Sequence, residues 1–168
     1  RKERYVLEDS LIVVFSMILA VILMFVFPIM DTWERQDDIS YMSVYATVVE
    51  FVDSVRNLGY ITPTMYTQFL RNINATGNRY EVTLEHRKRI YNINAYKNVY
   101  TTTIEGILDS GNDYRDMKAG DYFYVSVKNT NKTQSTVIKE SVYASKQETF
   151  KIGVPYGGMV RNTANAID

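Results

Sequence analysis

Residues 11–30 form an apolar run that limits what the chain can fold into. The run reads LIVVFSMILAVILMFVFPIM, contains no charged side chain, and is interrupted only by Ser16 and Pro28. A helix of about 20 apolar residues spans the hydrocarbon core of a bilayer. A helix on the surface of a soluble domain keeps a polar face, and this run has none. We therefore expect residues 1–30 to form a short stub and a transmembrane helix, with a buried core helix as the alternative.

The charges that flank the run predict its orientation. Arg1, Lys2 and Arg4 precede it, whereas acidic residues, beginning with Asp31, follow it. Because basic flanks stay on the cytoplasmic side, we expect a single-pass membrane protein with a cytoplasmic N-terminus and an extracellular C-terminal domain. The run is longer than the roughly 7 to 15 apolar residues of a signal-peptide core, and no small-residue cleavage site follows it. We therefore expect the anchor to be retained.

Composition narrows the functions open to the rest of the chain. The 19 basic and 19 acidic residues balance, which argues against a nucleic-acid partner. Cysteine is absent and His86 is the only histidine, which excludes thiol catalysis, a histidine-based triad and a multi-histidine metal site. The carboxylates considered for acid–base work are Glu85, Glu105, Asp109 and Asp121. Because their spacing pairs none of them, we predict no enzyme activity, no cofactor and no metal site.

Residues 31–58 predict an amphipathic helix that continues the apolar one. Its apolar stripe consists of Val44, Val48, Phe51, Val55 and Leu58, widened by Tyr41, Tyr45 and Val52. Gly59 is the expected C-terminal cap. Pro28 either bends a single rod or separates two helices. A joined rod would be about 80 Å long, half in lipid and half against a folded head.

The residues after Gly59 predict an α+β head with a small antiparallel sheet and short helices. We expect a helix that starts at Pro63 behind the cap Thr62, and two more over residues 101–110 and 133–144. The third helix is expected to turn Val137, Ile138 and Val142 inward. Strands are expected over residues 79–91, 122–128, 148–154 and 159–161, with a loop at 92–99 and a turn at 155–158. The predicted divisions are residues 1–30, 31–60 and 61–168.

Two charged segments are candidates for contacts between chains. Residues 86–89 (HRKR) are either a solvated strand face or an interface with the acidic residues 31–38 of another copy. Glu8 and Asp9 stand directly before the apolar run. They either lie at headgroup level, as acids near a helix N-terminus, or one of them pairs with a cation of a neighbouring subunit.

Together these features resemble a type IV pilin-like subunit. The resemblance rests on Glu8 in a short polar N-terminus, the apolar run with Pro28, the amphipathic continuation to Leu58 and a small β-rich head. Residues 7–14 (LEDSLIVV) are similar to the pilin segment in which a glutamate precedes an aliphatic run. The closest branch is the TadE-like minor pilins of Tad-type pili.

The resemblance implies a structural protein: a minor or priming subunit of a bacterial surface pilus or secretion pseudopilus. Its partners would be the membrane, copies of itself or related pilin-like subunits, and assembly-platform proteins. Glu8 would neutralise the amino terminus of an adjacent subunit. The residues expected at assembly contacts are Glu8, Asp9, Pro28, Trp33, Tyr41 and Tyr45.

The alternative function is a membrane-anchored extracytoplasmic module that binds a peptide, a glycan or a cell-wall ligand. One structural feature separates the two interpretations. An unbroken helix from membrane to head favours the pilin-like subunit, whereas a flexible break at residues 28–38 favours the tethered module.

Overall fold

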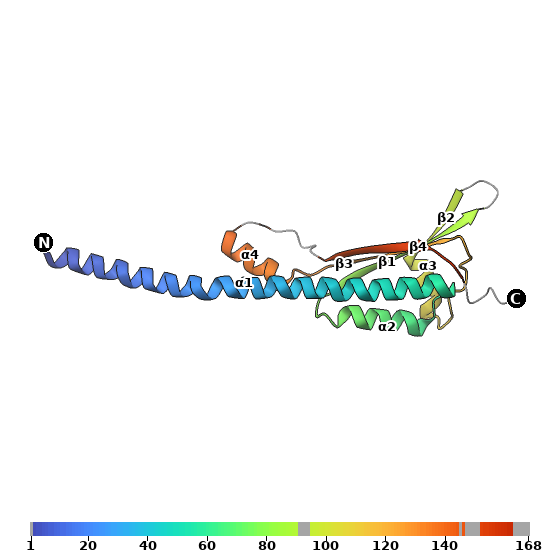
Figure 1. Cartoon of the computed structure of the whole chain (residues 1–168), viewed down its shortest axis with the longest axis horizontal. Helices are drawn as coiled ribbons and strands as arrows, with labels where there is room; N and C mark the ends of the chain where they lie inside the picture. The colour runs from blue at the N-terminus through green and yellow to red at the C-terminus, as the bar shows by residue number, and fades with distance from the viewer. Residues whose placement is uncertain (1, 91–94, 145, 147–151, 163–168) are drawn as a thin grey trace.

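One helix, α1 (Lys2–Leu58), runs through most of the length of the molecule in the computed structural model (Figure 1). The structure describes residues 2–90, 95–144, 146 and 152–162, and for residues 2–9 it describes the backbone alone. With 57 residues that each rise by about 1.5 Å, α1 is about 85 Å long. It passes through Pro28 without a break. The two helices predicted on either side of Pro28 are therefore one rod.

The head combines a four-stranded antiparallel sheet with short helices. The strands are β1 (Tyr80–Ile90), β2 (Ala95–Tyr100), β3 (Tyr122–Asn129) and β4 (Gly153–Met159), in the order β2-β1-β3-β4. The short helices of the described chain are α2 (Pro63–Asn74), α3 (Thr101–Asp109) and α4 (Gln134–Tyr143). The predicted α+β class, with a long apolar N-terminal helix packed on an antiparallel sheet, is confirmed.

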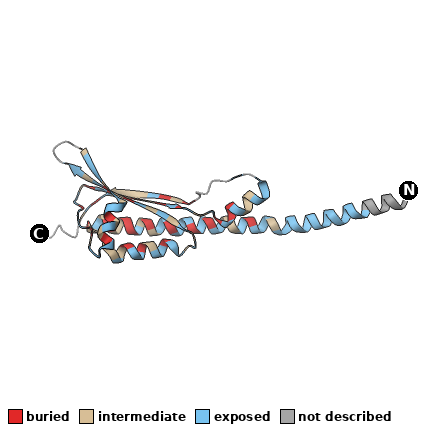
Figure 2. Ribbon diagram, turned by 180° about the vertical axis from the view of Figure 1, so that it is seen from behind, coloured by how far each residue is buried: buried red, intermediate tan, exposed pale blue. Residues whose placement is uncertain are grey.

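The second half of α1 lies between the sheet and α2 (Figure 1). Phe51 occupies the centre: its ring stacks on Phe69 of α2 at a centroid distance of 4.3 Å and meets Phe123 of β3 edge-on at 6.3 Å. Further core side chains are Val44, Val48, Val52, Val55, Leu84, Val125 and Val127. Figure 2 shows that burial along α1 is confined to its head-side half.

Several local signals in the sequence lead to the observed elements. Thr62 caps α2 by accepting a hydrogen bond from the backbone N–H of Met65 at 3.2 Å, and Pro63 is the first helical residue. Gly59 ends α1 with a φ of +78°, a left-handed conformation that favours glycine. The alternation in β1 is also confirmed, because Leu84 and His86 are buried, whereas Glu81, Thr83 and Arg87 are exposed.

The loop predicted over residues 92–99 is wrong where the chain is described. Ala95–Tyr100 forms β2, which pairs with the end of β1 from Ile90↔Ala95 to Glu85↔Tyr100; residues 92–94 lie outside the described residues. The segment is polar because it is an edge strand with an open face. Pairing with β1, rather than its own composition, makes it a strand.

The turn predicted at residues 155–158 is also wrong. β4 runs straight from Gly153 to Met159 and pairs with β3 along that whole length. It replaces the two predicted strands at 148–154 and 159–161, of which residues 148–151 lie outside the described residues. An edge strand tolerates Pro155. Glycine at position 157 lets β4 lie close to β3, since a Cβ there would be 2.7 Å from the carbonyl oxygen of Phe123.

Candidate assembly surface

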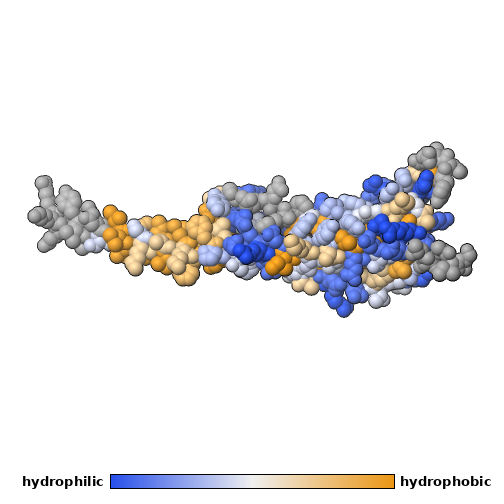
Figure 3. Space-filling model, in the orientation of Figure 1, coloured by the Kyte–Doolittle hydropathy of each residue, from blue (hydrophilic) through white to orange (hydrophobic). Residues whose placement is uncertain are grey.

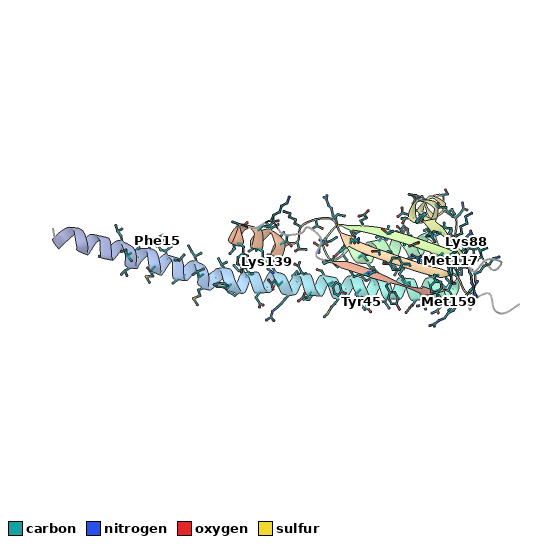
Figure 4. The ribbon with its side chains drawn as sticks, turned by 90° about the horizontal axis from the view of Figure 1, so that it is seen from above. Phe15, Tyr45, Lys88, Met117, Lys139 and Met159 are labelled. Carbon is teal, nitrogen blue, oxygen red and sulfur yellow. The ribbon has the colours of Figure 1, made fainter. Side chains whose placement is uncertain are left out.

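The apolar half of α1 is bare along its described side chains. From Leu11 to Phe25 every residue is exposed, and the first buried residue is Met30. Figure 3 shows this half as an apolar surface that ends where the polar head begins, and in Figure 4 Phe15 points away from the rod. Covering apolar surface is worth about 25 cal/mol per Å², so this surface favours lipid or other apolar helices as neighbours. By length and composition the helix is able to cross a membrane.

A narrower apolar surface continues on α1 beyond the run. Its residues are Ile39, Met42 and Ala46, here called the outer stripe. Ile39 is 60% exposed and Met42 is 68% exposed. Their spacing of three and four residues puts them on one side of the helix, opposite the side that buries Val44 and Val48. The rod therefore has one face for its own head and one open face.

The prediction that Tyr41 and Tyr45 widen the core stripe is wrong. Both rings are exposed, and they stack on each other with centroids 6.3 Å apart. Helical spacing places these rings beside the core side of α1. Among the described residues, however, no part of the head packs over them. The two tyrosines widen the open surface of α1 instead.

The predicted assembly residues lie along one helix and do not meet in one pocket. Glu8 and Asp9 belong to the first three turns of α1, where the side chains fall outside the described part of the chain. Pro28 is exposed and Trp33 is half-buried. From Glu8 to Tyr45 the helix rises by about 55 Å. These residues can therefore act together only as an extended surface.

A buried cluster of one acid and several hydroxyls fastens α4 to α1. Asp37 is buried, and its Oδ2 accepts hydrogen bonds from Thr133 Oγ1 at 2.8 Å and from Ser135 Oγ. Thr133 also caps α4, because its side chain accepts from the backbone N–H of Thr136. Thr133 and Asp37 are 96 residues apart in the sequence, and a polar contact of this kind produces no periodic pattern. Sequence reasoning therefore missed this contact.

The same cluster explains a wrong prediction about α4. Its buried residues are Ser135 and Thr136, whereas Val137 and Val142 are exposed and Ile138 is half-buried. The sequence predicted that these three apolar residues turn inward. The hydrogen bonds to Asp37 set the rotation of α4 instead, since a buried carboxylate without partners is costly.

His86 is fully buried and held on both ring nitrogens. Its Nδ1 lies 2.7 Å from the Tyr114 hydroxyl and its Nε2 lies 3.0 Å from Asp121 Oδ2. Asp121 also accepts from the backbone N–H groups of Lys118 and Arg89. Burial lowers the pKa of His86, and the neighbouring carboxylate opposes that shift. A neutral ring that donates from Nε2 to Asp121 and accepts at Nδ1 satisfies every partner, so the group ties the 110–121 loop to β1.

Glu105 and Glu85, two of the other carboxylates considered for acid–base work, have separate partners. Glu105 accepts a hydrogen bond from the Tyr66 hydroxyl, and burial together with this contact raises the pKa of Tyr66. Glu85 pairs with Arg87 at 2.9 Å on the outer face of β1. Within the basic run 86–89 the histidine is buried, whereas Arg87 pairs with Glu85 and Lys88 pairs with Asp116. The structure does not gather the four carboxylates into one site.

An open groove of about 510 Å³ lies on the sheet. It is lined by Arg87, Tyr96, Tyr122, Phe123, Tyr124, Gly157 and Gly158. The rings of Tyr96 and Tyr122 meet edge to face with centroids 5.8 Å apart. Sequence reasoning missed the groove because it placed no strand at β2 and a turn at β4, and these strands supply two of its sides.

Comparisons with protein-family models, with curated proteins and with solved structures give no match for this chain. The architecture is pilin-like: a long apolar N-terminal helix packs against a four-stranded antiparallel sheet.

Proposed function

We propose that this protein is a structural subunit, minor or priming, of a bacterial surface pilus or secretion pseudopilus, and that it is not an enzyme. The observation that carries the proposal is the continuity of α1 from Lys2 to Leu58, including residues 28–38. A tethered binding module would have a flexible link there. A continuous helix instead fixes the distance and angle between the apolar half and the head, which a regular filament requires.

The apolar half of α1 would carry the assembly. Before assembly it would span the membrane, with the basic N-terminus in the cytoplasm and the head outside. A helix that moves from lipid into a bundle of sister helices exposes no apolar area to water, so association rests on packing and on paired charges. Glu8 would supply the charge that pairs with the amino terminus of the next subunit.

The outer stripe would extend these contacts from the membrane half into the head half of α1. Ile39 and Met42 are exposed large apolar side chains at the start of the head half of α1, on the side opposite the core. Exposed apolar residues arranged along one helix side are typical of a helix-packing seam. The partners would be copies of this chain or related subunits, together with the assembly platform that moves them out of the membrane.

Shearing of surface filaments from producing cells tests the proposal. We expect the protein to sediment with the sheared filaments, in addition to a pool in the membrane. An unrelated single-pass membrane protein of the same cells reports contamination by membrane fragments. Confinement of the protein to the membrane pool, at the level of that marker, would contradict a filament role.

The groove on the sheet favours a second function, binding of a glycan. Flat exposed tyrosine rings offer apolar faces to sugar rings, and their hydroxyls and the Arg87–Glu85 pair offer hydrogen bonds. Tyr122→Ala would then reduce retention of the protein on immobilised cell-wall polysaccharide. Tyr143→Ala, on α4 and outside the groove, is the matched control. Equal retention of both variants and the unchanged chain would count against glycan binding.

A further inference from the structure

A polar pocket of about 270 Å³ lies where the head begins, beside the start of α4 (Figure 1). It is bordered by α1, by the turn that follows α2 and by the link from β3 to α4. The side chains that line it include Trp33, Gln36, Asn78, Asn131, Lys132 and Gln134. None of its described residues lines the groove on the sheet. The pocket is therefore a separate site, and the assembly proposed through the apolar half of α1 does not use it.

Hydrogen bonds hold the walls of this pocket in place. Asn131 Oδ1 accepts from the backbone N–H of Arg79 at 2.7 Å, and its Nδ2 donates to Asn78 Oδ1 at 3.1 Å. These two bonds join the turn after α2 to the link before α4. The hydroxyl cluster around Asp37 joins the same link to α1. The three walls are thus tied to one another, and the pocket is formed before any ligand arrives, as is usual for small-molecule sites.

Two uncommitted amides and an aromatic ring line the pocket together. The side chains of Gln36 and Gln134 are exposed and form no hydrogen bond with the described residues. Each amide offers both donors and an acceptor. Trp33 is half-buried and lines the same space. An aromatic face with donors and acceptors beside it fits a small ring that carries hydroxyl groups.

The charges around the pocket disfavour an anionic ligand. Asp37 is buried and belongs to the wall, whereas the ammonium of Lys132 lies 2.6 Å from Glu140 Oε2 and is already paired. A phosphate or a carboxylate would therefore meet a net negative wall. A cation would leave the N–H donors of Gln36 and Gln134 unused, whereas a neutral sugar uses donors and acceptors alike.

We propose that this pocket binds a neutral hexose, with the sugar ring against Trp33 and its hydroxyls hydrogen-bonded to Gln36 and Gln134. Its volume of about 270 Å³ lies just below the range of about 300–1,000 Å³ for drug-sized ligands, which suits a single sugar ring. The inference goes beyond the proposed assembly role and does not depend on it.

The position of the pocket along α1 suggests two sources for the hexose. Trp33 follows the end of the apolar run by three residues, or about 4.5 Å of helix. In the membrane-spanning placement of α1 the pocket therefore lies near the lipid headgroups. The sugar can be the headgroup of a glycolipid or one unit of a cell-wall glycan, and the test separates these sources.

The fluorescence of Trp33 reports the pocket directly, because the chain has no other tryptophan. The full chain is kept in a polyoxyethylene ether detergent, which carries neither sugar nor charge, and is titrated with methyl β-glucopyranoside. A small neutral ligand of this kind binds at roughly millimolar concentration. We expect a saturable change in emission and about a twofold fall in quenching by acrylamide as the sugar covers the ring. Sorbitol, which has similar hydroxyls but no ring, should have no effect.

Removal of the two amides tests the assignment of the hydroxyl partners. Gln36→Ala combined with Gln134→Ala should raise the glucoside concentration at half-saturation about tenfold or more. Gln68→Ala is the matched control, because Gln68 is an exposed glutamine of α2 outside the pocket. Tyr122→Ala, in the groove on the sheet, should also respond like the unchanged chain.

Vesicles of phosphatidylcholine with and without a monoglucosyl diacylglycerol provide the second arm. Protection of Trp33 from acrylamide by this lipid would support the pocket with a glycolipid as its source, and a response to the soluble glucoside alone would support it with a glycan. No response to either sugar would overturn the proposal, as would an equal response to sorbitol or in the double variant. A response to choline chloride but not to the glucoside would overturn it in favour of a cationic ligand. Each of these failures leaves the assembly role untouched, since none of the measurements involves a filament.

Discussion

Arg56, in the last turn of α1, donates a hydrogen bond from Nε to the carbonyl oxygen of Met159 at the end of β4, at 3.0 Å. The backbone N–H groups of Arg161 and Asn162 donate in turn to the carbonyl oxygen of Arg56. Asp53 holds the same guanidinium through Nη1 at 2.7 Å. The end of the rod is therefore fastened to the edge strand by backbone and side chain. A displacement of the rod will move the head with it.

The close contact of β4 with β3 predicts the effect of a single methyl group. A Cβ at position 157 would lie 2.7 Å from the Phe123 carbonyl oxygen and 2.9 Å from the Cα of Tyr124, so β4 would have to move away. We expect Gly157→Ala to lower the free energy of unfolding by about 1–3 kcal/mol. Urea titration of the full chain in detergent, followed by near-ultraviolet circular dichroism, measures it.

Gly106→Ala is the control for that substitution. Gly106 lies inside α3, and a Cβ there would meet nothing within 4 Å. Because alanine favours a helix over glycine, we expect a gain of about 0.5–1 kcal/mol. Destabilisation of equal size in both variants would refute the steric account of β4.

The sequence predicts the helical rod and most of the head, but not the edges of the sheet. The apolar run and the stripe with Val48 and Phe51 are continuous or periodic patterns. The cap at Thr62 is a local signal at a single position. β2 and β4 lack such signals, because an edge strand with an open face needs no apolar alternation and tolerates Pro155. Their pairing is decided by neighbours that are distant in sequence.

The contacts that attach α4 and His86 are also outside the reach of periodicity. Asp37 and Thr133 are far apart along the chain, as are His86 and Asp121, and each pair is made by polar groups that could equally well face water. Glu8 and Asp9 are a different case, because their expected roles concern other subunits. Those roles stay predictions.

The buried histidine predicts how stability depends on pH. Because burial lowers the pKa of His86 below its ordinary value of 6.5, the unfolded chain binds a proton more readily than the folded one. Stability is then full above about pH 6.5 and falls as the pH drops through the folded-state pKa. We expect the urea midpoint to decrease between about pH 7.5 and pH 5.

His86→Gln isolates the contribution of the histidine to that slope. Glutamine keeps a donor and an acceptor but does not titrate. The variant should be less stable at neutral pH and should lose less stability on acidification than the unchanged chain. An identical pH slope for both chains would show that the histidine does not cause it.

The acid–hydroxyl cluster predicts that Asp37 holds α4 against α1. Asp37→Ala leaves the Thr133 and Ser135 hydroxyls without their buried acceptor, which costs about 1–3 kcal/mol locally. We expect faster amide hydrogen exchange in α4 and unchanged exchange in β3. Asp38→Ala, at the adjacent exposed position, should leave both unchanged. Slow exchange in α4 after loss of Asp37 would mean that other contacts hold it.

The carboxylate at the membrane edge predicts a variant that folds but does not assemble. Glu8→Ala should remove the charge pairing with the next subunit and reduce the protein in sheared filaments, while the head keeps its urea midpoint. Asp9→Ala, one residue along the same helix, keeps Glu8 and is the matched control, so it should assemble like the unchanged chain. Normal incorporation of Glu8→Ala into filaments would rule out the charge-pairing role.

The most direct test of the whole account is a cross-link across the outer stripe. The chain has no cysteine, so Met42→Cys introduces a single thiol on the open side of α1, and Asn98→Cys on β2 serves as an exposed control. If α1 packs against sister helices, a short bismaleimide should join the Met42→Cys chains into dimers in the sheared filament fraction far more than the Asn98→Cys chains. A Met42→Cys chain that stays monomeric there, or that never leaves the membrane fraction, would contradict assembly through α1.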